Sequence, residues 1–200
     1  MLDKSQKTCI IRDIYCGARL KTDKKEMIVL SKLHTRRLAV GALFCALVLA
    51  ATLISVPTPV VGNANLGDGV LLLGAWTLGG PFGAAAVALG AMLADLIGGY
   101  AAYAPGTLLI KLSMALVAIL LDRLLRSFKL PRGFCHLVAG LTAELVMILG
   151  YFLYEAFVLS FGPTVAAANI PFNAVQGVLA LLVSVTVYPL VERLGLCKRL

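Results

Sequence analysis

The chain has 200 residues, of which 60% are hydrophobic and 14% are charged, and its formal net charge is +8. A soluble domain has about 45–50% apolar and about 25% charged residues, so this composition excludes an ordinary soluble protein. The basic residues flank apolar segments at separate places, which argues against a nucleic-acid-binding domain. From Leu38 onward we expect a multi-pass membrane protein that contacts the lipid bilayer and no nucleic acid.

The distribution of charge predicts three parts. Half of the charged residues lie in the first 37 positions, so residues 1–37 are predicted to be a basic cytoplasmic extension, with Met27 as an alternative start. Residues 38–193 are predicted to form the membrane domain, and residues 194–200 a short basic cytoplasmic tail. The start of the chain has no apolar run of about 7–15 residues, so we expect no signal peptide.

Apolar segments of roughly 20 residues predict membrane-spanning helices. Four such segments are Leu38–Val56, Gly106–Leu125, Phe134–Phe161 and Pro171–Val191. A fifth apolar segment, 68–98, is interrupted by Gly79-Gly80-Pro81-Phe82-Gly83, and Gly and Pro in such a run favour a turn. We therefore predict two short helices there and an all-α fold with six transmembrane helices. The alternative is one long kinked helix and five helices in all.

The basic residues distinguish these alternatives. Seventeen of the eighteen Lys and Arg residues lie in the stretches 4–37, 123–132 and 193–199. Six helices place all three stretches on one side of the membrane, whereas five helices place the second stretch opposite the first. Because Lys and Arg concentrate in cytoplasmic loops, we predict six helices with both termini in the cytoplasm. The connections predicted outside, which contain no Lys or Arg, lie near 57–67, 99–105 and 162–170.

Several motifs of catalysis and metal binding are absent from the sequence. The five cysteines form no CxxC pair, which argues against both disulfides and a zinc site. The chain also lacks the GxxxxGK[ST] phosphate loop, HExxH and GxSxG, so it cannot hydrolyse ATP by the phosphate-loop route. We expect no catalytic residue, no cofactor and no metal ion.

Ionisable residues inside a membrane are costly and usually functional. The candidates are Asp68, Asp95, Lys111, Glu144 and Glu155, most of them predicted near the outer ends of their helices. The inner halves of the helices hold almost nothing comparable in this reading. The sequence therefore predicts a polar cavity that opens to the outside and is closed by apolar packing toward the cytoplasm.

Helical spacing groups the polar residues. Glu144, Tyr151 and Glu155 fall on one face of their helix, and the amides at positions 169, 173 and 176 fall on one face of the next. Aromatic side chains near these positions could stack on a small planar ligand; they are Trp76, Tyr100, Tyr103, Tyr151 and Tyr154.

Simpler roles are open for single residues. Tyr100 and Tyr103 could belong to the interfacial aromatic belt, and Asp68 could be only a helix cap. Asn173 could be only an interhelical hydrogen bond. Lys111 has two alternatives, an ion pair with Asp95 that joins two helices or a donor to the ligand.

Small residues recur at every fourth position of the first predicted span. Ala42, Ala46 and Ala50 form a small-xxx-small pattern, which lets helices approach closely. The pattern predicts either packing within the protein or a docking face for another membrane subunit.

Several motifs in order resemble the substrate-binding S component of energy-coupling factor (ECF) vitamin transporters. They are Asn65-Leu-Gly-Asp68-Gly, Leu78-Gly-Gly-Pro-Phe-Gly, Ala94-Asp95-Leu-Ile-Gly-Gly-Tyr100, Ala104-Pro-Gly-Thr107-Leu-Leu-Ile-Lys111 and Asn169-Ile-Pro-Phe-Asn173-Ala-Val-Gln176. The resemblance covers about residues 36–194 and implies a bacterial-type cell membrane protein. It also implies a transmembrane T subunit and two cytosolic ATPases as partners, with the alanine face of the first helix meeting the T subunit.

The first of these motifs resembles the riboflavin-transporter-like branch of the family. We favour a pyridoxine-like or hydroxymethylpyrimidine-like substrate, with riboflavin as a further candidate, because a bulky flavin fits less well among this many charged groups. The predicted substrate-binding residues are Asn65, Asp68, Lys111, Glu144, Tyr151, Glu155, Asn169, Asn173 and Gln176.

Three other functions compete with this prediction. A solitary proton-coupled carrier would use Asp95 and Glu144 as relays. An intramembrane enzyme would use Glu144 and Glu155, but eleven residues along one helix separate them by about 16 Å, too far for a shared reaction centre. A purely structural membrane subunit is the fourth hypothesis.

Overall fold

The computed structural model describes residues 35–57 and 63–193. The chain separates into two units, Met1–Ala39 and Val40–Leu200, and the second contains every candidate residue named above. The predicted basic extension, its alternative start and the carboxyl-terminal tail lie almost entirely outside the described residues.

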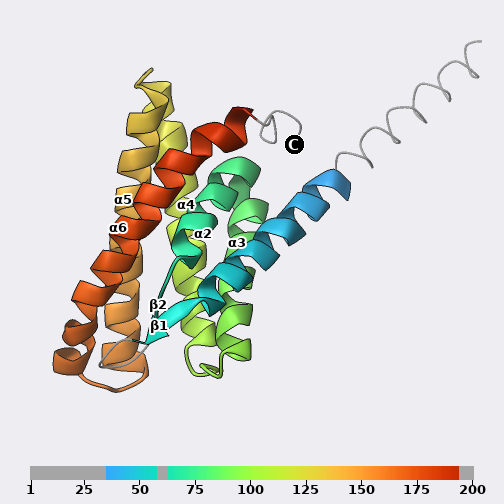
Figure 1. Ribbon diagram of the computed structural model, residues 1–200. Helices are drawn as coiled ribbons and strands as arrows, with labels where there is room; N and C mark the ends of the chain where they lie inside the picture. Colours follow the sequence, from blue (N-terminus) through green and yellow to red (C-terminus); the bar gives the residue numbers. More distant parts are fainter. Residues whose placement is uncertain (1–34, 58–62, 194–200) are drawn as a thin grey trace, which may run out of the picture. The chain divides into compact units, whose positions relative to one another are not determined.

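The described residues form six helices and one short antiparallel strand pair (Figure 1). In chain order they are the helix Thr35–Leu53, β1 (Ser55–Pro57), β2 (Asn63–Asn65), α2 (Gly67–Leu78), α3 (Gly80–Ile97), α4 (Ala104–Ser127), α5 (Arg132–Leu153) with its π-helical continuation η1 (Tyr154–Val158), and α6 (Pro163–Arg193). Helix α4 packs against α3 and α5, while α2 packs against α3, α4 and α6. Polar side chains on α2, α4 and α6 can therefore meet.

The break at the double glycine confirms six helices and shows that the five-helix alternative is wrong. Helix α2 ends at Leu78 and α3 begins at Gly80. Gly79 and Gly80 have φ angles of 62° and 67°, a region that glycine enters without steric cost. Pro81 then lies in the first turn of α3, where its missing N–H leaves no lost hydrogen bond.

Two predicted helix boundaries are wrong. Helix α6 begins at Pro163 rather than Pro171, so most of the predicted 162–170 loop is helical. Proline within a membrane helix is tolerated where neighbouring groups bond the freed backbone, and Pro171 therefore did not mark a start. The first helix ends at Leu53, because the chain then extends into β1, where Ser55 pairs with Asn65 of β2.

Length and composition agree with a membrane protein. Four helices among the described residues are long and apolar enough to cross a bilayer; they are Thr35–Leu53, Gly80–Ile97, Arg132–Val158 and Pro163–Arg193. Helix α2 has only 12 residues. Helix α4 has 24 residues and carries the isolated Lys111 within its apolar first half.

Close helix contacts and an apolar layer hold the second unit together. A Cβ atom added at Gly90 would lie 2.4 Å from the carbonyl oxygen of Cys45, so α3 and the first helix are in near-backbone contact. The side chains that we call the apolar layer are fully buried at the middle of α2, α4 and α5; they are Leu71, Leu72, Met114 and Met147. Each lies between the polar residues at the two ends of its helix.

Candidate functional site

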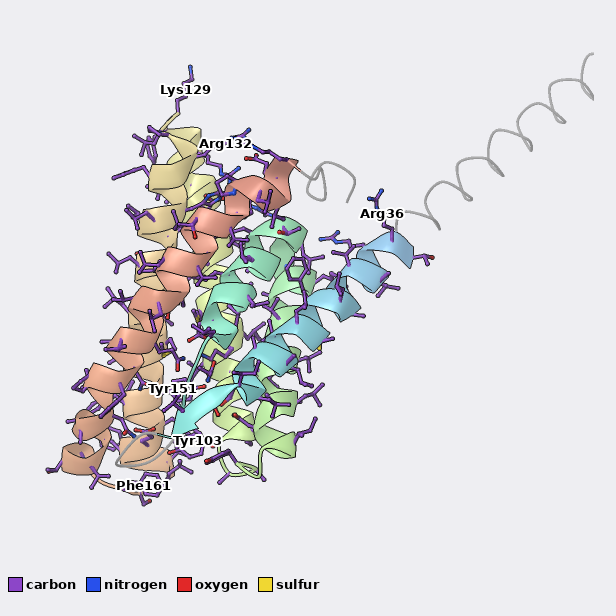
Figure 2. All side chains as sticks on the ribbon, in the orientation of Figure 1. Arg36, Tyr103, Lys129, Arg132, Tyr151 and Phe161 are labelled. Carbon is purple, nitrogen blue, oxygen red and sulfur yellow. The ribbon has the colours of Figure 1, made fainter. Side chains whose placement is uncertain are left out.

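A cavity of about 330 Å³ opens among the helices at the end where α3 passes to α4. Figure 2 shows Tyr103 and Phe161 at this end of the helices and Lys129 and Arg132 at the other. Most of the side chains around the cavity are polar or aromatic, and they are Thr52, Ser55, Asn65, Asp95, Tyr100, Tyr103, Thr107, Lys111, Tyr151, Glu155, Asn173 and Gln176. Residues from every helix except α2 therefore contribute to one site.

Most of the residues predicted to bind substrate lie around this cavity. Six of the nine line it, namely Asn65, Lys111, Tyr151, Glu155, Asn173 and Gln176. The other three, Asp68, Glu144 and Asn169, are buried behind the lining. The roles of all nine in binding stay predictions, while their gathering at one place is a property of the fold.

Lys111 forms a buried ion pair with Asp68, not with Asp95. Gln176 Nε2 donates a hydrogen bond of 2.5 Å to the second Asp68 oxygen. The Gln176 side-chain oxygen accepts a 2.9 Å bond from the Asn65 backbone N–H. This network ties α2, α4, α6 and β2 together at the inner wall of the cavity, and it exposes only part of Lys111 and Gln176 to a ligand.

A second network surrounds Glu155 in the π-helical turn η1. Asn169 Nδ2 donates to one carboxyl oxygen at 3.0 Å, and the Tyr103 hydroxyl donates to the other at 3.3 Å. Burial and then the neighbouring Glu155 charge hold the pKa of Tyr103 well above its usual range, so its hydroxyl keeps its proton. A π turn inserts one extra residue into a helix and is frequent at functional sites; here it brings Glu155 to the cavity.

Three tyrosines give the cavity an aromatic wall. Tyr100 and Tyr103 meet edge to face with 6.4 Å between ring centroids, and both line the cavity. Tyr151 shares a 3.0 Å hydrogen bond with Thr107. Lys111 Nζ lies 5.2 Å from the centroid of the Tyr151 ring. Tyr154 instead packs against Gly106 and bonds the Ala102 carbonyl, so its predicted ligand contact is not supported.

The sequence reasoning missed several lining residues. Thr107 lies one helical turn before Lys111, so helical spacing could have found it. Asp95, Tyr100 and Tyr103 are candidates in the sequence analysis, but they are not among the nine predicted substrate-binding residues. Thr52 and the strand residue Ser55 approach the cavity through the packing of the first helix and β1, for which no local sequence pattern exists.

Comparison with known protein families and structures identifies the family of this chain. A model of the family described as the ECF-type riboflavin transporter, S component, matches residues 32–194. The chain belongs to this family. A solved structure of the S component of a bacterial ECF transporter superposes with a TM-score of 0.63 and 21% identity, covering 80% of this chain and 98% of that one. No curated protein matches the sequence.

This S component is therefore a multi-pass cell membrane protein, as its apolar helices and its family both indicate. The family match and the S component fold together confirm the resemblance found in the motifs. The likeness of the solved structure, at 21% identity, concerns the fold.

The alanine pattern of this S component lies on an exposed helix face. Ala42, Ala46 and Ala50 are exposed, whereas Phe44 and Val48 on the opposite side are buried against the rest of the second unit. The small residues therefore do not serve packing between the helices of the second unit.

The opposite end of this S component holds a polar and aromatic cluster, so the prediction that the inner halves lack polar groups is wrong. The His136 ring contacts the rings of Trp76 and Tyr188, and its centroid lies 4.5 Å from that of Trp76 and 4.2 Å from that of Tyr188. Arg126 lies 2.9 Å from Asp122 and 2.6 Å from His136 Nε2. Because a guanidinium only donates, His136 Nε2 accepts that bond.

We call this region the basic end, and it contains Arg123, Arg126, Lys129 and Arg132. Trp76 belongs to it, so the expectation that Trp76 contributes to the ligand surface is wrong. A groove there of about 290 Å³ lies beside Trp76, Arg123 and Tyr188. His136 is buried, because α5 packs it against Trp76 of α2 and Tyr188 of α6.

Proposed function

We propose that this S component binds a small, water-soluble vitamin or vitamin precursor in the cavity and delivers it to an ECF transporter for uptake. The observation that carries the proposal is the convergence of tyrosine rings, amides and charged groups on one cavity in a member of this family. Ligand sites in proteins combine apolar or aromatic walls with a few placed polar groups in this way.

The size of the cavity favours a one-ring ligand. Pockets for small molecules span about 300–1,000 Å³, and the cavity, at about 330 Å³, lies at the lower limit. A pyridoxine-like or hydroxymethylpyrimidine-like ring fits such a volume better than a three-ring flavin. Hydroxyl groups on the ligand could bond Asn173 and the exposed part of Gln176.

Binding of the purified protein to a vitamin panel tests the proposal. The panel contains B6 forms, hydroxymethylpyrimidine, thiamine and riboflavin, and binding is measured by calorimetry in detergent. We expect one single-ring compound to bind with a dissociation constant below about 1 μM, equivalent to roughly 8 kcal/mol. Absence of binding to every compound at micromolar concentration contradicts the proposal, and tight binding of riboflavin alone contradicts the choice of ligand.

We further propose that both termini are cytoplasmic and that the cavity opens to the outside. In support, the connection 98–103 at the cavity end contains no Lys or Arg, whereas the connection between α4 and α5 is basic. In a variant without native cysteines, a cysteine at Ala101 should react with a membrane-impermeant maleimide in intact cells. A cysteine at Lys129 should react only after lysis, and the reverse pattern contradicts this topology.

The same proposal includes a transmembrane T subunit and two cytosolic ATPases as partners. The sequence has no phosphate loop, so ATP hydrolysis has to come from another chain. The exposed alanine face of the first helix, at Ala42, Ala46 and Ala50, is the surface that we assign to the T subunit, since small residues allow close helix approach.

One observation favours a second candidate, a solitary proton-coupled carrier. Glu144 is 2% exposed, and neither of its carboxyl oxygens has a hydrogen-bond partner among the described residues. A buried carboxyl group without a partner is more stable in its neutral form, and a group of this kind could carry a proton. Uptake that persists without any ATPase and stops when the proton gradient is removed would support this candidate.

A further inference from the structure

The ionisable groups around the cavity are unbalanced in charge. Four carboxyl groups, Asp68, Asp95, Glu144 and Glu155, lie in or behind its lining, and Lys111 is the one cation there from residues 35–57 and 63–193. Lys111 is already paired with Asp68. The next cation along α4 is Arg123, 12 residues farther, at about 18 Å. Three carboxyl groups thus share the cavity region with no second cation from the described part of α4.

These three carboxyl groups differ in what they can offer a ligand. Glu155 already accepts hydrogen bonds from Tyr103 and Asn169. Glu144 packs behind the wall, beside Gly177, and does not line the cavity. Asp95 lines the cavity, and its Oδ2 atom is buried without a hydrogen-bond partner among the described residues. Thr107 and Lys111 line the same cavity, where Thr107 shares its hydrogen bond with Tyr151 and Lys111 pairs with Asp68.

A carboxylate in this position can accept a hydrogen bond from a ligand in the cavity. Leaving a charged group at membrane depth without an ion pair is costly, and the cost falls when a ligand supplies a cation or N–H donors. Tyr100 and Tyr103 line the same part of the cavity, and aromatic faces attract cations as well. Both features favour a positively charged or amino-bearing ligand over a neutral or anionic one.

We propose that Asp95 selects a small heteroaromatic ring that carries an amino or protonated nitrogen group, and that the cavity discriminates against flavins and phosphate esters. This inference rests on the proposed function and specifies its ligand class. Asp95 acts as a specificity-determining residue through an N–H···carboxylate contact. The carboxylates of Asp95 and Glu155, which line the cavity, oppose a ligand phosphate, because like charges at close range repel.

Two matched ligand pairs test the inference on the purified full-length protein. The first pair is pyridoxamine and pyridoxine, which differ by an ammonium in place of a hydroxyl. The second pair is 4-amino-5-hydroxymethyl-2-methylpyrimidine and its 4-hydroxy analogue. We expect the amino-bearing member of at least one pair to bind about tenfold more tightly or better, as a charge-assisted hydrogen bond provides.

The variant Asp95→Asn should remove most of this preference while the affinity for the hydroxyl member changes by less than about threefold. Glu192 lies on α6 and pairs with Arg132 of the basic end, far from the cavity lining, so Glu192→Gln is the matched control and should keep the preference. A wild-type protein that binds both members of each pair equally, or prefers the hydroxyl member, riboflavin or a phosphate ester, overturns the inference and leaves the proposed function standing. If no compound binds, both are overturned. The wild-type ratio tests the ligand class even if Asp95→Asn does not fold, and a folded Asp95→Asn that keeps the preference overturns the role of Asp95.

Discussion

Replacing Lys111 by methionine should destabilise the protein by about 3–5 kcal/mol, because it leaves the buried Asp68 carboxylate without its cation. Asp68 is 1% exposed, so water cannot replace the lost partner. Gln176 still donates one hydrogen bond to it, which offsets only part of the charge. The measurement is thermal and denaturant unfolding in detergent, together with the yield of folded protein.

Two further variants separate the ion pair from other effects at Lys111. Adding Asp68→Asn to Lys111→Met removes both charges and keeps an acceptor for Gln176, so most of the lost stability should return. Lys129→Met, at an exposed lysine of the basic end, should change stability by less than about 0.5 kcal/mol. If Lys111→Met unfolds like the wild type and loses only ligand binding, Lys111 is a ligand donor and the structural role is wrong.

Replacing Ala46 by tryptophan should abolish vitamin uptake and leave vitamin binding unchanged. Ala46 lies at the middle of the exposed alanine face, where a T subunit helix could approach only if the side chains are small. A tryptophan holds two helices apart by several ångströms without entering the cavity. We expect at least a tenfold loss of uptake in cells with the complete transporter, and unchanged binding to the purified protein.

Leu145→Trp is the matched control, since Leu145 is 58% exposed on α5, away from the alanine face. It should retain uptake. Uptake that Ala46→Trp leaves intact in cells with the complete transporter contradicts the assignment of this face. If that uptake also stops with a protonophore, the solitary carrier with Glu144 becomes the better function.

Periodicity and charge are sufficient to predict six of the residues that line the cavity. Asn173 and Gln176 lie three positions apart on one helix face, and Lys111 and Glu155 lie near the same helix ends as these amides. Depth in the membrane follows from chain position once the helices are counted, so polar residues at one depth converge. The break at Gly79 and Gly80 gives the count of six helices.

Which side chains pair with one another depends on contacts between helices, and no local sequence pattern predicts these contacts. Asp68 and Asp95 lie at similar depth, and only the packing of α2 between α4 and α6 brings Asp68 to Lys111. His136 and Tyr188 are 52 positions apart, and their stacking with Trp76 depends on the same packing. Proline also led to a wrong helix boundary. Pro171 lies inside α6, whereas in a soluble protein the helix would be expected to end there.

The apolar layer has an electrical consequence. Leu71, Leu72, Met114 and Met147 are fully buried between the cavity and the basic end. In the proposed topology, a voltage across the bilayer would therefore drop mainly across this apolar layer. A ligand with one positive charge would cross it with about 2.3 kcal/mol of work for every 100 mV. Transport of an amino-bearing vitamin should thus carry a measurable current, whereas transport of a neutral vitamin should carry none.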